Sequence, residues 1–196
     1  MNGWHRVQID NETIWTIHRP PADVQLGRLH EHLALDDDQH RDLDAYHEAA
    51  HAMVAVDAGI PVHTVEIRPG QHPSGWMTYG SWTGPWVDLA TMCAAGEQGA
   101  LRWLREIGRY TETGGWAAEV AAYSDRAAAE AMCSEPVSVI TDDPTTRHDW
   151  RHLGALAQQR LAVLWPAVHD LAATLIAHGT AGPDDLPALR HHQGLP

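Results

Sequence analysis

The sequence predicts an α+β fold that is mostly α-helical, with a small β-sheet beside one of the helices. Three observations support this prediction. Long segments repeat apolar residues at helical spacing, short segments near residues 4–18 and 62–68 alternate apolar and polar residues, and Gly and Pro separate the two kinds of segment. At 196 residues, of which 44% are hydrophobic, the chain is long enough to bury the core of one domain.

The N-terminal segment predicts a β-hairpin. Residues 4–18 contain two short β-prone runs that are separated by Asp10, Asn11 and Glu12. The following residues, 22–35, are ambiguous between a loop and a short helix. We therefore expect a hairpin and lead-in over residues 1–35 and the main domain over residues 36–196, together forming one compact unit.

The next three elements alternate between helix and strand. Asp36, Asp37 and Asp38 are N-cap candidates for a long helix that stops at Gly59. Residues 62–68 (VHTVEIR) alternate as a strand does, and residues 75–79 predict a second short strand. The sheet is therefore expected directly after the long helix.

The C-terminal half is expected to be helical. The predicted helices cover residues 87–104, 116–132, a segment from near 148 past 165, and 167–177. The pair Gly114-Gly115 is expected to separate the first two, and Pro166 to kink or divide the third. Gly179 ends the last helix, and Asp184 and Asp185 cap a final short turn.

The composition excludes some classes of partner. A net charge of −13 argues against binding to nucleic acid or to an anionic membrane surface. The sequence has no secretory signal pattern and no run of 18 apolar residues, which favours a cytoplasmic protein without a membrane span. Cys93 and Cys133 are then expected to be buried thiols, with a disulfide as the alternative. A homo-oligomer is compatible with the sequence.

The motif that carries chemistry is His47-Glu48-Ala49-Ala50-His51, inside the predicted helix 36–59. Two histidines four residues apart lie on one face of a helix and can bind one ion. The glutamate after the first histidine is placed to take a proton from water. His47, His51 and Glu48 are therefore predicted as two zinc ligands and a general base. Because the chain has 15 histidines, a chance pair is the alternative interpretation.

Residues 45–70, AYHEAAHAMVAVDAGIPVHTVEIRPG, carry a resemblance to a known family. They resemble the peptidase domain of the FtsH-type AAA proteases, in which H-E-A-G-H-A precedes a segment close to P-V-H-K-V-T-I-x-P-R-G. Ala50 stands where the family has glycine. CAAGEQGA at 93–100 is similar to the family's G-R-A-A-E-E helix. The resemblance implies a zinc-peptidase-like helical domain with a small β-sheet beside the active-site helix.

Two hallmarks of that family are missing from this sequence. It contains no G-x-x-x-x-G-K-[ST] phosphate loop and no predicted membrane anchor. We therefore expect a stand-alone, ATP-independent relative of the peptidase domain, which would not unfold its substrates.

A third metal ligand is expected besides the two histidines, because a catalytic zinc usually has three protein ligands. In the resembled family, this ligand is an aspartate that opens a later helix, in a pattern like N-D-L-x-x-A. Asp149, in RHDWRHLGALA, is the favoured match, although a plain N-cap would explain it equally well. Asp125, in AYSDRAAAEA, is the second choice, and the remaining candidates are His148, His152 and Glu97.

The resemblance also implies where a substrate binds. An extended peptide is expected to pair with the edge of the strand 62–68, which makes Val65, Glu66 and Ile67 the candidate substrate-binding residues. Three tryptophans follow in a Gly/Pro-rich segment, at positions 76, 82 and 86. They are expected either to form a wall of the substrate pocket or to pack together.

Three functions remain open at this stage. The first is a zinc metallopeptidase that cleaves peptide bonds, and the second is a zinc enzyme that acts on an amide or ester of a small molecule. The third is a non-catalytic binding module that retains the fold. An intact Glu48 argues against the third, because a site that has lost catalysis has no need of its base.

Overall fold

The computed structural model describes residues 4–9, 12–22, 32–68, 74–132 and 149–187. Helices dominate, and the strands are few and short, so the predicted α+β, mostly helical class is confirmed. Most of residues 22–35, which were ambiguous between a loop and a short helix, and Cys133 lie outside the described residues.

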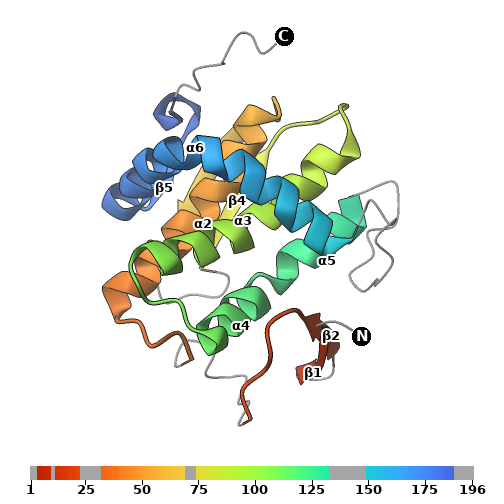
Figure 1. The fold of residues 1–196 in the computed structure, drawn as a ribbon. Helices are drawn as coiled ribbons and strands as arrows, with labels where there is room; N and C mark the ends of the chain where they lie inside the picture. Colours follow the sequence, from red (N-terminus) through yellow and green to blue (C-terminus); the bar gives the residue numbers. More distant parts are fainter. Residues whose placement is uncertain (1–3, 10–11, 23–31, 69–73, 133–148, 188–196) are drawn as a thin grey trace.

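Three long helices form the centre of the fold: α2 (Asp37–Asp57), α3 (Trp86–Glu106) and α6 (Trp150–His178). Each packs against the other two, and Figure 1 shows α6 lying across α2 and α3. Alanine and glycine occupy much of the buried surface of α2 and α3, including Ala50 and Gly99. Small residues let the two helix backbones approach closely, which brings the middle of α3 against the histidines of α2.

The sheet follows α2, as predicted. Its strands are β3 (Val62–Ile67), β4 (Gly75–Tyr79) and β5 (Thr180–Ala181), in the order β4-β3-β5 with both pairings antiparallel. The central strand, β3, is therefore paired on both sides, and β4 is at one edge of the described sheet. β3 and β4 both contact α2, so the sheet lies beside the helix that carries the motif.

The N-terminal hairpin and two short helices gather at one end of the helical core. The hairpin is formed by β1 (His5–Ile9) and β2 (Glu12–Thr16) and lies next to α4 (Glu112–Ala121). α5 (Tyr123–Met132) follows α4 and packs on α3. The 3₁₀ turn η2 (Pro183–Asp185) ends the described chain near β3.

Gly114 and Gly115 do not separate two helices, contrary to the prediction. They lie inside α4, whose N-terminus is capped by Thr111 through a 2.9 Å hydrogen bond from the Gly114 N–H. The break after α3 comes earlier, at residues 107–111, where Gly108 has a left-handed φ of 69°, and the helix predicted at 116–132 is divided at Ala122 into α4 and α5. Gly115 packs on the ring of His18, where an added Cβ would lie 2.7 Å from Cδ2, so glycine is required here for close contact rather than for a turn.

Pro166 does not divide the last helix. α6 continues through it to the left-handed Gly179, with φ of 77°. Trp165 and Val168 on either side are buried in the core, and this packing keeps the helix continuous despite the hydrogen bond that proline cannot donate.

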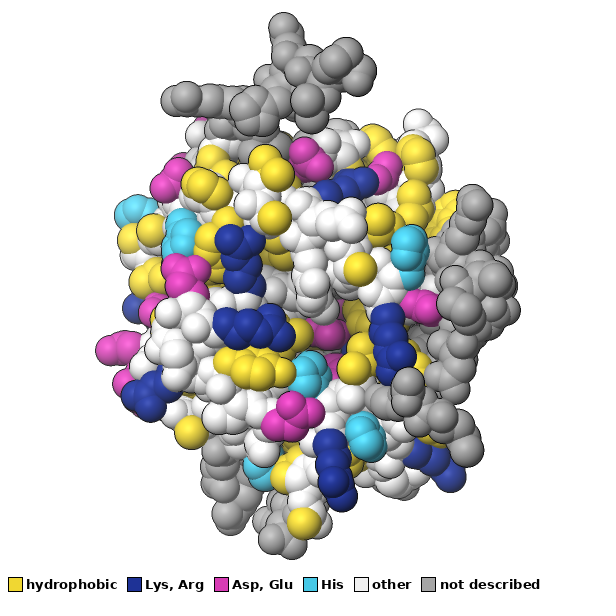
Figure 2. All heavy atoms as spheres, in the orientation of Figure 1, with side chains coloured by type: hydrophobic (Ala, Val, Ile, Leu, Met, Phe, Trp, Pro, Cys, Tyr) yellow, Lys and Arg dark blue, Asp and Glu magenta, His cyan; other side chains and the backbone are white. Residues whose placement is uncertain are grey.

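By length and composition, α6 is also apolar enough to cross a membrane, alone among the described helices. One of its faces packs on α2 and α3 and buries Leu153, Leu161 and Leu171. A role in the core therefore accounts for its composition. On the face shown in Figure 2, acidic, basic and hydrophobic side chains are interspersed.

Candidate metal centre

α2 brings His47, Glu48 and His51 to one place. Asp36 caps the helix: its side chain accepts a 2.9 Å hydrogen bond from the Gln39 N–H, and the Gln39 side chain accepts one from the Asp36 N–H. Within the helix, the four-residue spacing places the two imidazoles edge to face, with ring centroids 4.7 Å apart and an interplanar angle of 76°. The sequence prediction for this part of the site is therefore consistent with the observed geometry.

Asp125 of α5 completes a cluster that can hold a metal ion. The Nε2 atoms of His47 and His51 lie 3.0 Å apart, and Oδ2 of Asp125 lies 3.2 Å from the first and 3.4 Å from the second. An ion bound tetrahedrally at about 2.0–2.1 Å would separate its ligands by roughly 3.3 Å. The three ligand atoms therefore already have the spacing that one tetrahedral ion requires.

The second nitrogen of His51 supports this arrangement. Its Nδ1 lies 2.7 Å from the backbone carbonyl oxygen of Met92 in α3. A protonated Nδ1 donates to that carbonyl and leaves Nε2 as the free acceptor, which is the usual arrangement for histidines that bind a metal. α3 thus orients the ring as well as covering it.

Gly96 of α3 lies directly over the two imidazoles. An added Cβ there would lie 2.5 Å from Nε2 of His47 and closer still to Nε2 of His51, distances that real Cβ atoms do not show. Glycine therefore leaves open the space that the two ligand nitrogens face. No role was predicted for Gly96 itself, although it lies in the segment 93–100 that is similar to the family's G-R-A-A-E-E helix.

The cluster favours a cation electrostatically. Burial alone would lower the pKa of His51, but the negative charge of Asp125 outweighs it and raises this pKa to about 9. Burial alone would raise the pKa of Asp125, but the charges of His51 and His47 hold it well below its usual range. A metal ion would thus replace a proton on His51, and its binding would release that proton.

Glu48 is buried beside the cluster and lines a cavity of about 290 Å³. Burial raises the pKa of its carboxyl group, although the nearby histidines oppose this. Gly75, the first residue of β4, packs on it: an added Cβ would lie 2.6 Å from Oε1 of Glu48. The cavity also has an apolar side, to which Leu33, Leu43 and Val120 contribute.

Asp149, the favoured third ligand, is not part of this cluster. It is the N-cap of α6, and its Oδ1 accepts a 2.6 Å hydrogen bond from the His152 N–H. Glu97 instead binds Arg126 and Trp150, and His148 lies outside the described residues. The second choice, Asp125, is the one brought to the histidines. Asp125 lies in the first turn of α5, which begins at Tyr123 and not at 116, where the predicted helix began.

The expected substrate strand also needs correction. Val65 and Ile67 are buried, and Val65 and Glu66 pair with β4 on one side and β5 on the other. The backbone N–H of Ile67 donates to Gly179. These residues therefore do not form a free edge. In the described sheet, the strand at the edge beside the cavity is β4, which starts at Gly75.

The tryptophans pack rather than line the cavity. Arg68 stacks over Trp76 at 3.8 Å, while Trp82 and Trp86 lie partly buried against the core. None of the three is among the residues that line the cavity next to Glu48.

Comparison with known proteins assigns no family. No protein-family model matches the chain, and no curated protein matches it at a significant level.

Proposed function

We propose that this chain is a zinc-dependent hydrolase, and specifically an ATP-independent metallopeptidase. The observation that supports this most strongly is the set of separations between the three ligand atoms, 3.0, 3.2 and 3.4 Å. Two imidazoles and one carboxylate are donors that zinc accepts, and three protein ligands leave one position open, as in catalytic zinc sites. The resemblance of residues 45–70 to the FtsH-type peptidases supports the same assignment.

Glu48 supplies the acid–base chemistry in this proposal. Bound zinc would act as a Lewis acid that polarises the scissile carbonyl and acidifies water. Glu48 accepts a proton from the attacking water and delivers it to the leaving nitrogen as the C–N bond breaks. Its raised pKa suits both steps, because a carboxyl group that titrates nearer neutral pH can both accept and return a proton.

The substrate is proposed to bind along β4. The edge of this strand could pair with an extended peptide, whose backbone would then pass the carboxylate of Glu48 at Gly75. The cavity next to it has apolar walls and a volume of about 290 Å³, enough to accept one side chain of the substrate.

The experiment combines metal analysis with an activity screen. We expect the purified protein to contain about one zinc per chain, to lose it to a chelator, and to cleave members of an unstructured peptide library. Glu48→Gln should keep the metal but lose about 100-fold or more in rate, because it removes the proton acceptor. Glu130→Gln, at an exposed position of α5, is the matched control and should retain activity.

Each part of the proposal can fail separately. A protein that takes up no zinc would refute the metal centre. Another resident metal, such as iron, would refute the zinc assignment. Zinc without peptide cleavage would refute the peptidase and favour an amide or ester of a small molecule, which the same screen can include.

A further inference from the structure

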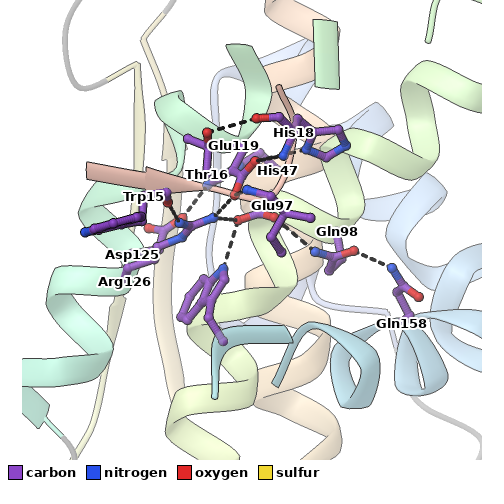
Figure 3. A network of polar contacts seen from close by, with 12 residues as sticks. Trp15, Thr16, His18, His47, Glu97, Gln98, Glu119, Asp125, Arg126 and Gln158 are labelled. Carbon is purple, nitrogen blue, oxygen red and sulfur yellow. Dashed lines mark hydrogen bonds and ion pairs between the residues drawn. The ribbon is translucent and has the colours of Figure 1, made fainter. Parts of the chain in front are cut away.

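Asp125 is followed in the chain by a fully buried arginine. The side chain of Arg126 is 1% exposed and lies between the carboxylates of Glu97 and Glu119, which are equally buried. Figure 3 shows the guanidinium group between these two carboxylates, with Asp125 of the metal centre next to it on the same helix. A buried charge is unusual in a domain of this size and calls for a physical reason.

Arg126 joins three other elements of the fold. Its Nη2 donates to Oε2 of Glu97 in α3 at 3.1 Å and to Oε1 of Glu119 in α4 at 2.6 Å. Its Nη1 donates to the backbone carbonyl of Trp15 in β2 at 2.7 Å. One side chain therefore connects α5 to β2, α3 and α4.

The carboxylates have further partners that hold them in place. Glu97 also accepts hydrogen bonds from Nε1 of Trp150 at 3.0 Å and from Gln98 at 3.2 Å. Glu119 accepts hydrogen bonds from the backbone N–H groups of Ile17 and His18, at 2.7 and 3.0 Å. A network in which the buried oxygens are paired in this way is rigid, because moving one member leaves another without a partner.

α5 is held to the core by small contacts and by one buried charge. It is 10 residues long, Arg126 and Ala129 are its buried residues, and Tyr123, Ala128 and Met132 are partly buried against the core. Arg126 is therefore the one buried polar side chain through which this helix is hydrogen-bonded to β2, α3 and α4. Asp125, on the same turn as Arg126, would move with the helix. A shift of well under 1 Å would already take its carboxylate out of range of an ion held by two histidines.

We infer that Arg126 is a positioning residue that holds Asp125 at the metal centre. This inference rests on the metal centre of the proposed function, but not on the identity of the substrate. The alternative is that Arg126 only stabilises the fold. The two differ in one respect: a positioning residue affects the affinity for metal at temperatures where the variant is fully folded.

Two variants of the full-length protein test this. Arg126→Met removes the charge while keeping roughly the length of the side chain. Arg126→Lys keeps the charge but replaces the planar fork, which reaches its three acceptors through two nitrogens, by a single ammonium. Arg160→Met is the matched control, because Arg160 also lies between two carboxylates, Asp57 and Asp88, away from the cluster. The affinity for zinc is measured by competition with a fluorescent chelator, and the Tm of the metal-free protein is measured in parallel.

We expect both Arg126 variants to bind zinc about 10- to 100-fold more weakly than the wild type, the range typical of residues that orient metal ligands. The visible absorption spectrum of cobalt(II)-loaded Arg126→Lys should also differ from that of the wild type, because it reports the geometry of coordination. Arg160→Met should match the wild type in both measurements. Arg126→Lys decides the outcome if Arg126→Met does not fold.

The inference is wrong if Arg126→Lys lowers the Tm but leaves the zinc affinity and the cobalt spectrum unchanged. It is also wrong if Arg160→Met weakens zinc binding as much as the Arg126 variants do. A wild-type protein that binds no zinc would instead refute the proposed function, and the inference with it.

Discussion

Replacing Gly96 by alanine tests the proposed metal centre most directly, because this residue contacts both histidines of the cluster and has no side chain that could bind a metal. The new Cβ would lie 2.5 Å from Nε2 and 2.6 Å from Cε1 of His47, and closer still to Nε2 of His51. Ordinary contacts of this kind begin at 3.4 Å. The imidazoles would therefore have to retreat by roughly 1 Å to restore van der Waals contact.

That displacement is large for a metal site and modest for the fold. Ligand distances in such sites hold to within about 0.2 Å, so we expect the affinity for zinc to fall by about 100-fold or more. Alanine gains about 1 kcal/mol of helix propensity over glycine, while overpacking costs about 1–3 kcal/mol. The metal-free protein should thus lose at most about 2 kcal/mol, or about 8 °C in Tm for a chain of this length.

The assay measures zinc affinity by chelator competition and Tm by circular dichroism without metal. Gly99→Ala is the control: its Cβ would crowd Ala50 and lie 3.0 Å from the Tyr46 carbonyl oxygen, at the same α2–α3 contact but away from the ligands. This control variant should have a lower Tm, but its zinc affinity should fall by less than about tenfold, the smallest loss typical of a disturbed metal site. If both variants lost zinc affinity equally, the loss would come from separation of the two helices and not from contact with the histidines. An unchanged zinc affinity in Gly96→Ala would refute the site geometry.

Two further predictions concern the neighbours of the site. Gly75→Ala would place a Cβ 2.6 Å from Oε1 of Glu48 and so displace this carboxylate. The kcat of the proposed hydrolysis should therefore fall by up to about 100-fold while zinc affinity is retained. An unchanged kcat would contradict the proposed role of Glu48. Burial lowers the pKa of His18, but its hydrogen bond to Glu119 and the charge of that carboxylate outweigh this and raise the pKa above 6.5. The protonated ring therefore contributes stability below about pH 6.5 that is lost as the pH rises through the folded-state pKa. The difference in Tm between the metal-free wild type and His18→Gln should accordingly shrink with rising pH, whereas a constant difference would refute the link.

The sequence alone was sufficient for features that depend on neighbouring residues. The spacing of His47 and His51 places both on one face whenever the segment is helical, and the Asp36 cap and the Gly59 stop delimit that helix locally. The strand Gly75–Tyr79 and the N-terminal hairpin were predicted for the same reason, since alternation and turn residues act over a few positions. The helical class of the fold follows from the sum of these local preferences.

Other features were decided only by how distant elements pack. Asp125 and Asp149 both have the local pattern of a residue near a helix start, and only the docking of α5 on α3 brings Asp125 to within 3.2 Å of His47. The pairing of β3 with β5 comes from the far end of the chain, and it turns an expected edge strand into a central one.

The same holds for the residues that support the ligands. The sequence pattern assigns no role to Gly96 or Arg126 individually, because their importance comes from what lies opposite them in space. The histidine pair is thus a local property of one helix. The approach of Asp125, the proposed third ligand, and the contacts that support it are properties of the packed core, in which one residue's position depends on contacts between several elements.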